Sequence, residues 1–132
     1  MIASLAASLA LLAGPTAGLP PATPVGMSAR EYSFGVYKTR VPTGRVKLNV
    51  HNYGEDAHDL QVRGPHGYRS AVSPEIAPDE TLSFNVRLRR PGRYLFICLK
   101  PGHAARGMKA HITVRKRRRL PRPALSSGAC AR

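Results

Sequence analysis

Apolar and polar residues alternate along six segments of the chain, with the two-residue period that places every second side chain on the same face of a β-strand. The segment 82–89 shows this clearly, because Leu82, Phe84, Val86 and Leu88 share one parity. The six segments cover residues 31–36, 45–50, 58–63, 82–89, 94–98 and 108–115. We find no convincing helical period, so the pattern predicts an all-β chain.

Turn sequences separate these segments. They are Pro42-Thr43-Gly44, Tyr53-Gly54-Glu55-Asp56, Gly64-Pro65-His66-Gly67, Ala77-Pro78-Asp79-Glu80 and Pro91-Gly92. Short strands with regularly spaced turns are typical of a β-sandwich or barrel. Alternation also indicates that each sheet has one face toward solvent, which suits antiparallel pairing. We therefore expect one all-β domain, a sandwich or a barrel, over residues 30–115.

Candidate metal ligands gather after the segment 94–98. Cys98, His103 and Met108 lie within eleven residues and offer a thiolate, an imidazole and a thioether. Soft sulfur donors beside imidazole select copper, and two His, one Cys and a weak Met form the electron-transfer geometry. Structural zinc sites use Cys and His without a thioether. The second imidazole must come from elsewhere, and His58 is the best placed.

The parity of each residue tests this choice. Cys98, Met108 and His58 each share the apolar face of their own segment, so all three should point into the core near strand ends. His51 and His111 fall on polar faces and His66 lies in a turn, so we expect all three at the surface. Taken alone, His58 is better explained as a core histidine and Met108 as a core methionine. His103 alone is better explained as an exposed loop residue. Their joint pattern predicts a metal site.

The segments that carry this pattern resemble the cupredoxins, the plastocyanin-like and azurin-like blue copper proteins. The matching segments are Asn52-Tyr53-Gly54-Glu55-Asp56-Ala57-His58-Asp59-Leu60, Gly92-Arg93-Tyr94-Leu95-Phe96-Ile97-Cys98, Pro101-Gly102-His103 and Gly107-Met108. The resemblance covers residues 32–114 and implies a Greek-key β-sandwich of about seven to eight strands. It also implies one type 1 copper ion, with His58, Cys98 and His103 as equatorial ligands and Met108 as the long axial ligand.

The chain departs from the usual family pattern at three places. The family often has Asn directly after the first ligand His, where it ties two ligand loops together, and this chain has Asp59. Ala110 stands where many relatives have Gly, and the tail from Arg115 onward has no usual counterpart. A change beside a ligand alters its orientation and tuning, so Asp59 bears on the redox potential.

The resemblance implies a one-electron carrier that cycles between Cu(II) and Cu(I), with His103 as the electron port. We expect no enzyme, because four protein ligands leave no open position for substrate. Lys100, Arg106 and Lys109 flank the loop and predict docking near His103 of an acidic redox protein or a membrane electron-transfer complex. Two alternatives stay open. One is a copper storage or delivery protein, and the other is a metal-free cupredoxin-like module that binds anionic surfaces through its basic half.

The N-terminal residues predict export. Residues 2–13 are almost wholly apolar, too few to span a bilayer, and small residues follow them. We expect a signal peptide over residues 1–18 and a Pro-rich linker over residues 19–29, although no Lys or Arg precedes the apolar run. The expected location is the periplasm, cell envelope or exterior, with membrane anchoring if the segment is not cleaved.

Charge divides the chain into two halves. The formal net charge is +14, all seven acids lie between Glu31 and Glu80, and residues 81–132 hold fourteen Lys and Arg. We expect residues 116–132 to form a basic disordered tail that contacts an anionic cell surface or lipid. No motif supports a specific nucleic-acid partner. Cys130 lies in this tail, and a disulfide with Cys98 is the less favoured interpretation.

Overall fold

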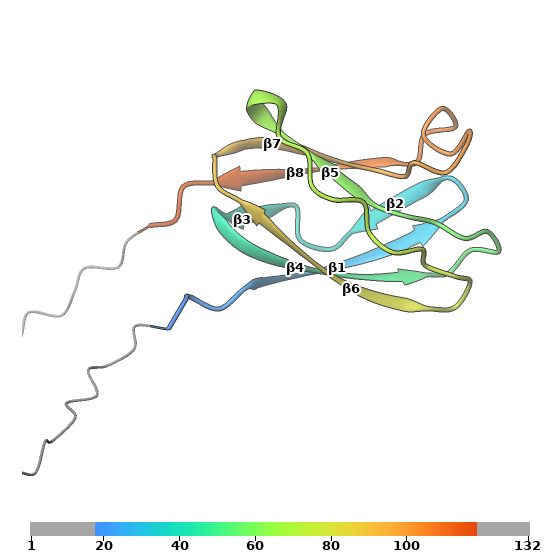
Figure 1. Cartoon of the computed structure of the whole chain (residues 1–132), viewed down its shortest axis with the longest axis horizontal. Coiled ribbons are helices and arrows are strands. Elements are labelled where there is room, and N and C mark those ends of the chain that lie inside the picture. The colour runs from blue at the N-terminus through green and yellow to red at the C-terminus, as the bar shows by residue number, and fades with distance from the viewer. Residues whose placement is uncertain (1–17, 119–132) are drawn as a thin grey trace, which may run out of the picture.

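Two four-stranded β-sheets pack face to face in the computed structural model, which describes residues 18–118 (Figure 1). The strands are β1 (Thr23–Arg30), β2 (Ser33–Val36), β3 (Arg40–Pro42), β4 (Gly44–Asn52), β5 (Gln61–Arg63), β6 (Thr81–Leu88), β7 (Gly92–Ile97) and β8 (Lys109–Arg115). A short 3-10 helix, η1 (Pro65–Gly67), follows β5. The all-β sandwich predicted from the sequence is confirmed.

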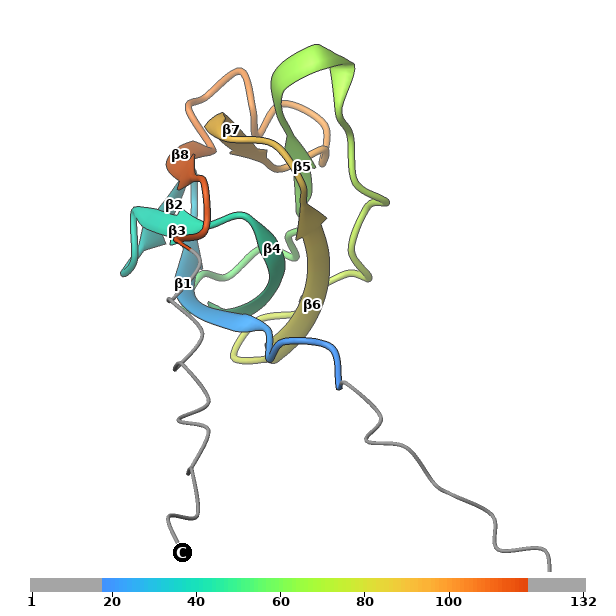
Figure 2. The same ribbon diagram turned by 90° about the vertical axis from the view of Figure 1, so that its left-hand side faces the viewer.

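The strand order is β2-β1-β4-β6 in one sheet and β3-β8-β7-β5 in the other. The pairs β1–β4 and β3–β8 are parallel, and the other pairs are antiparallel. Figure 2 shows the two sheets facing each other across the core. Alternate side chains fill this space, and Val46, Leu48 and Val50 of β4 are fully buried there. Burial of apolar side chains between the sheets is the main stabilising contribution.

The predicted linker over residues 19–29 is wrong from Thr23 onward, because these residues form β1, which lies between β2 and β4. The sandwich therefore begins before residue 30. Val25, Met27 and Ala29 are buried at strand spacing. Pro24, and small residues on the outward positions, conceal this alternation in the sequence.

The segment predicted as a strand over residues 58–63 is shorter in the structure. Only Gln61–Arg63 form β5, whereas His58 makes an isolated antiparallel bridge with Ile76. The remaining predicted segments correspond to β2, β4, β6, β7 and β8. Alternation therefore predicted these strands correctly. In the segment 58–63 it predicted too long a strand, because the chain around His58 has left the sheet.

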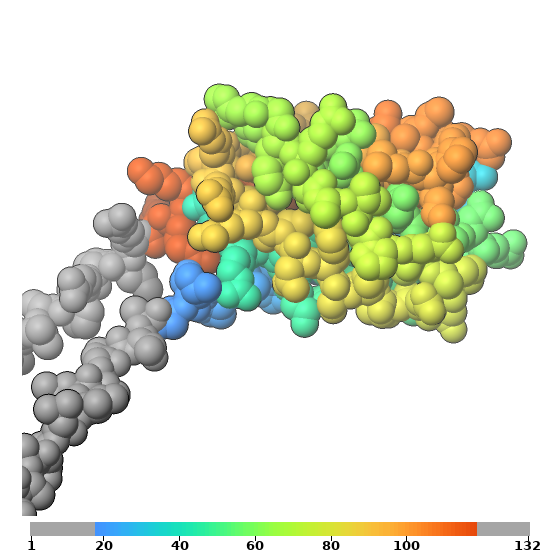
Figure 3. Space-filling model, in the orientation of Figure 1, coloured from blue at the N-terminus to red at the C-terminus, as the bar shows by residue number. Residues whose placement is uncertain are grey.

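The strands give the sandwich two distinct ends. At one end β1, β4 and β7 finish and β6 and β8 begin, and we call this the ligand end. At the other end β1 begins and β8 finishes, so residues 18–22 and 116–118 both leave there (Figure 1). Figure 3 shows the loop after β7, in orange, at the opposite end of the molecule from the end of β8, in orange-red.

Two predicted segments fall largely or wholly outside the described residues. The signal peptide expected over residues 1–18 is described only at residue 18, and the basic tail expected over residues 116–132 only as far as residue 118. Cys130 also lies outside, so its pairing stays a prediction. Within residues 18–118, no helix is long and apolar enough to cross a membrane.

Candidate metal centre

Three of the four predicted ligands meet at the ligand end. One ligand atom from each of His58, Cys98 and His103 lies within 4.8 Å of the others. The Nδ1 atoms of the two imidazoles are 3.2 Å apart, and Cys98 Sγ is 3.7 Å from His103 Nδ1. Two nitrogens that each bind one tetrahedral ion at about 2.0 Å lie about 3.3 Å apart. The spacing therefore fits a single small metal ion between the three side chains.

The local folds explain how the two loops present their ligands. Cys98 follows β7 directly and is fully buried. His103 lies in a tight turn, in which its N–H donates to Lys100 O at 3.1 Å. His58 is held by two main-chain bonds to Ile76, of 3.1 Å and 2.8 Å. Each ligand thus stands on backbone that is already fixed by hydrogen bonds.

Met108, the fourth predicted ligand, is fully buried directly before β8 and is bonded through its main chain to two of the other three. Its N–H donates to His103 O at 3.0 Å, and its carbonyl accepts from Cys98 N at 3.3 Å. The main chain of Met108 is therefore bonded to both ligand residues of the loop. A thioether in this position is suited to a weak, soft fourth ligand.

Carboxylates face the far nitrogens of both imidazoles. His58 Nε2 lies 3.3 Å from Glu31 Oε1, and His103 Nε2 lies 3.9 Å from Asp56 Oδ2. The His58 Nε2 atom is buried and makes no regular hydrogen bond, so its contact with Glu31 is electrostatic. A carboxylate at Nε2 favours the proton on that nitrogen, which leaves the Nδ1 lone pair free for a metal.

Burial shifts the protonation of two ligands toward their neutral forms. Burial lowers the pKa of His58, and the nearby Glu31 carboxylate opposes this. Burial also raises the pKa of the Cys98 thiol, while the backbone N–H groups of Asp59 and Lys100 act to lower it. A neutral imidazole is ready to bind a metal, whereas the thiol must lose its proton when the metal binds.

The turn between β1 and β2 supports the site from one side, and sequence reasoning missed it. Glu31 accepts from Asp56 N at 2.7 Å, besides facing His58. The ring of Tyr32 meets that of His103 edge to face, with centroids 5.0 Å apart. Arg106 lies over the Tyr32 ring at 4.7 Å and donates to its hydroxyl at 2.6 Å. No spacing rule connects residues so distant in sequence, and only the placement of β1 could have indicated them.

Asp59 ties the two ligand loops together. Its Oδ1 accepts from Leu99 N at 2.6 Å, and this bond joins the segment that follows His58 to the loop that follows Cys98. The departure from Asn noted in the sequence therefore keeps the tie but makes its acceptor a charged carboxylate.

The other histidines of the described chain do not join these ligand atoms. His51 Nδ1 lies 2.7 Å from Thr81 Oγ1, and its Nε2 lies 3.5 Å from Asp79 Oδ1. His111 is exposed on β8, and His66 is exposed in η1. The expectation that all three lie at the surface holds for His66 and His111, whereas His51 is half-buried.

Comparisons with known proteins concern the sequence of part of the chain and the arrangement of its strands. No family model matches the chain. A curated relative, a blue copper protein of Pisum sativum, is 37% identical over 67 residues, which are 50% of this chain and 35% of the relative. The chain thus matches about a third of the length of that protein.

Solved structures share the fold. Auracyanin from Roseiflexus castenholzii superposes with a TM-score of 0.61 at 20% identity, covering 74% of this chain and 99% of auracyanin. The multicopper oxidase mgLAC superposes with a TM-score of 0.57 at 18% identity, covering 76% of this chain and 41% of the oxidase. At these identities the likeness concerns the arrangement of the strands.

Proposed function

We propose that this chain, which has the cupredoxin fold and resembles the blue copper proteins, binds one type 1 copper ion and carries single electrons. The observation that carries the proposal is the convergence of His58, Cys98 and His103, whose ligand atoms lie within 4.8 Å of one another. Met108 would complete the set from its buried position beside them.

The chemistry of the donor set favours copper over other metals. One thiolate, two imidazoles and one thioether are soft or borderline ligands, which suit Cu(I) and Cu(II) and do not suit Mg²⁺ or Ca²⁺. Zinc would accept the three stronger ligands but gains little from Met108. Bound copper would supply the one-electron couple Cu(II)/Cu(I).

The protein's own part is to hold the ligands still. Asp59 fixes the loop after Cys98, Glu31 fixes the segment before His58, and Tyr32 limits the rotation of the His103 ring. Ligands that do not move between two oxidation states allow transfer with little reorganisation. These supports are therefore as important to the proposed function as the ligands themselves.

The proposed electron port is the outer edge of His103, whose side chain is 12% exposed. Leu99 is 38% exposed beside it, and Pro101 and Gly102 are exposed in the same loop. The loop thus offers a partner an apolar rim, and the Asp56 carboxylate, 3.9 Å from His103 Nε2, adds one negative charge beside the port.

The charges near the port refine the expected partner. Lys100 is paired with Glu75, and Arg106 is occupied by Tyr32, so two of the three cations that predicted an acidic partner are engaged. All seven carboxylates lie in the turns and loops of the ligand end. We therefore propose a redox partner with an apolar contact face and charges of both signs around it.

We also propose that the chain acts outside the cytoplasm. The apolar run over residues 2–13 supports this through its likeness to a secretory signal. Expression of the full chain in a bacterial host, followed by N-terminal sequencing of the product in each compartment, tests it. A cytoplasmic product that keeps residue 1 would contradict export.

Storage or delivery of copper is the second candidate, because the same ligands would serve it. The two functions differ in exchange: a store releases its ion to a competing chelator, whereas a carrier keeps it through both oxidation states. We do not propose oxidase activity. Among the described residues, one cluster of ligand atoms is present, and with Met108 it would supply four ligands to a single ion.

A copper titration followed by visible absorption tests the proposal. The full chain should develop an intense blue thiolate-to-copper band that saturates at one ion per chain, and Cys98→Ser should abolish the band. The matched control is His111→Gln, which changes an exposed histidine and should leave the band intact. A chain that binds no copper, or whose band survives Cys98→Ser, would contradict the site.

A further inference from the structure

The end of the sandwich opposite the ligands carries exposed cations and no acid. We call it the basic end, and its cations are Arg45, Arg87, Arg89, Arg90, Arg93, Arg115, Lys116 and Arg117. They come from three chain segments: the start of β4, the segment from the end of β6 to the start of β7, and the end of β8 with the residues after it. All seven acids of the chain lie between Glu31 and Glu80, in segments that reach the ligand end.

These cations are not neutralised within the molecule. No arginine among residues 18–118 forms an ion pair with a carboxylate. Arg45 and Arg87 are even direct cross-strand partners in the β4–β6 ladder. Like charges in directly opposite positions destabilise a sheet. These cations therefore have no carboxylate partner within the described residues and are available to an external anion.

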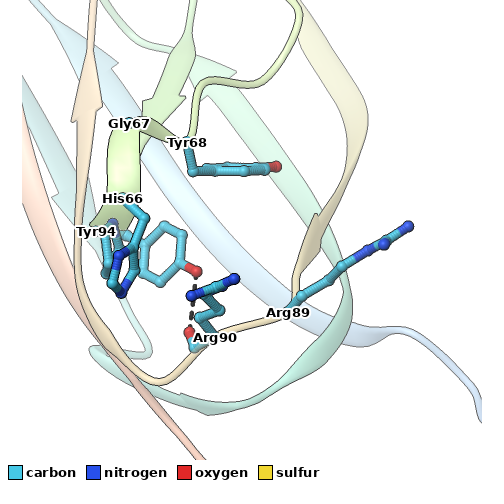
Figure 4. A pocket seen from close by; sticks show the side chains of 7 residues that line it. His66, Gly67, Tyr68, Arg89, Arg90 and Tyr94 are labelled. Atoms are coloured by element: carbon cyan, nitrogen blue, oxygen red, sulfur yellow. Dashed lines mark hydrogen bonds between the residues drawn. The ribbon is translucent and has the colours of Figure 1, made fainter.

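A pocket of about 250 Å³ opens beside these cations. It is formed by residues 65–68 of η1 and its C-cap, together with Arg89, Arg90 and Tyr94. Figure 4 shows the ring of Tyr68 on one side of the pocket and Arg90 on the other, with Arg89 extending outward. Tyr94 donates its hydroxyl proton to Arg90 O at 2.9 Å, which fixes the turn that carries both arginines. The guanidinium of Arg90 lies at the pocket and suits a phosphate oxygen, whereas that of Arg89 extends from the same turn toward solvent.

We propose that the basic end docks on a bilayer surface of anionic phospholipids, and that the pocket beside Arg89 and Arg90 receives a headgroup phosphate. The cations spread over one end of the molecule from three chain segments, which suits a flat surface better than the single track of a nucleic acid. Residues 18–22 leave the sandwich at this same end and connect it to the apolar residues 2–13. The ligand end would then face away from the membrane, toward a partner. This proposal goes beyond electron transfer and does not depend on the metal.

Vesicle flotation with the full chain tests the surface. The vesicles contain phosphatidylcholine alone, or phosphatidylcholine with about 30% phosphatidylglycerol. The variant Arg87→Gln/Arg89→Gln/Arg90→Gln removes three cations from the basic end. The control Lys38→Gln/Lys47→Gln/Lys109→Gln removes three exposed cations that do not line the pocket, so both variants have the same net charge.

The unmodified chain should bind the anionic vesicles and not the neutral ones. The basic-end variant should lose roughly a hundredfold in affinity, because each of the three cations near an anionic surface contributes about a factor of five. The control should lose less than about threefold. Circular dichroism of both variants should match that of the unmodified chain, which separates loss of binding from loss of folding.

Three results would overturn the proposal. One is equal weakening by both variants, which would mean that net charge alone is responsible. Another is undiminished binding by the basic-end variant together with full loss on deletion of residues 119–132, which would assign the contact to the tail. The third is tighter binding to a single-stranded DNA oligonucleotide than to the anionic vesicles, with the same loss in the basic-end variant, which would identify a polyanion as the partner.

Discussion

The two ends of the sandwich are built from the same eight strands and differ in almost everything else. The ligand end has long connections after β4 and β7, buried polar side chains and all the acids. The basic end has short connections, such as the one between β6 and β7, and exposed cations. The two sheets separate the two ends, so we expect a substitution at one end to leave the other end unchanged.

The difference is also one of stability. At the ligand end, Asn52 is fully buried and bonds three main-chain groups, which makes the loops rigid. At the basic end, Arg45 and Arg87 oppose each other and reduce stability. Hydrogen bonds that fix the loops are thus concentrated at the ligand end, where a metal needs fixed ligands. The basic end keeps opposed cations that lower its stability.

Asn52→Ala should have the largest effect on the ligand end. It removes the amide that donates to Asp56 O and Ile76 O and accepts from Gly54 N. Groups left unpaired in a buried place should lower the free energy of unfolding by about 3 kcal/mol. The control in the same strand, Asn49→Ala, loses one exposed bond to Ser83 and should cost less than about 0.5 kcal/mol. Urea unfolding measures both, and equal costs would contradict the comparison.

Gly64→Ala should be the largest single change at the basic end. A Cβ at this position would overlap the ring of Tyr94, which is 1% exposed and cannot move freely. The overlap should lower the unfolding free energy by roughly 2 kcal/mol and leave the copper band unchanged. Gly18→Ala has open space around it and serves as the control. Loss of the copper band in folded Gly64→Ala would show that the two ends are coupled.

Glu31→Gln should weaken the metal site without unfolding it. The amide keeps an oxygen for Asp56 N but removes the negative charge that faces His58 Nε2. Supports of this kind commonly change metal affinity by about tenfold or more, and a competition titration with a copper chelator should show a drop of about tenfold. Glu55→Gln alters an exposed carboxylate of the adjacent loop and should have little effect. An unchanged affinity in Glu31→Gln would remove Glu31 from the site.

Arg87→Gln should give the smallest effect, with the opposite sign. It relieves the repulsion with Arg45 and should raise the unfolding free energy by roughly 0.5 kcal/mol while it weakens vesicle binding. Arg93→Gln is the matched control: Arg93 lies opposite Thr113 in the β7–β8 ladder, so its replacement relieves no repulsion and should not add stability. A loss of stability in Arg87→Gln would contradict the argument that the basic end is built at the expense of the fold.

Most of the fold could be predicted because strand alternation is a local signal. It identified β4, β6, β7 and β8, and it placed Cys98 and Met108 on inward faces. β1 was missed because its outward positions are taken by Pro and small residues, so its alternation carries little contrast in polarity. The strands with which such a segment pairs in the sheet cannot be predicted from its own residues.

The candidate ligands could also be predicted, whereas their supports could not. Donor type and spacing suggested His58, Cys98, His103 and Met108, and the structure brings the first three together. The roles of Glu31 and Tyr32 depend on contacts between segments more than twenty residues apart. The gathering of acids at one end was equally hidden, because it follows from strand direction and not from sequence order.

A spectroelectrochemical titration of the copper-loaded full chain tests the central claim most directly, since it asks whether the ligand end holds an ion through a one-electron change. The account predicts that the blue band bleaches with one electron per chain and returns fully on reoxidation, over repeated cycles and with no loss of copper. Release of the ion on reduction, or a bound copper without a reversible thiolate band, would contradict an electron carrier.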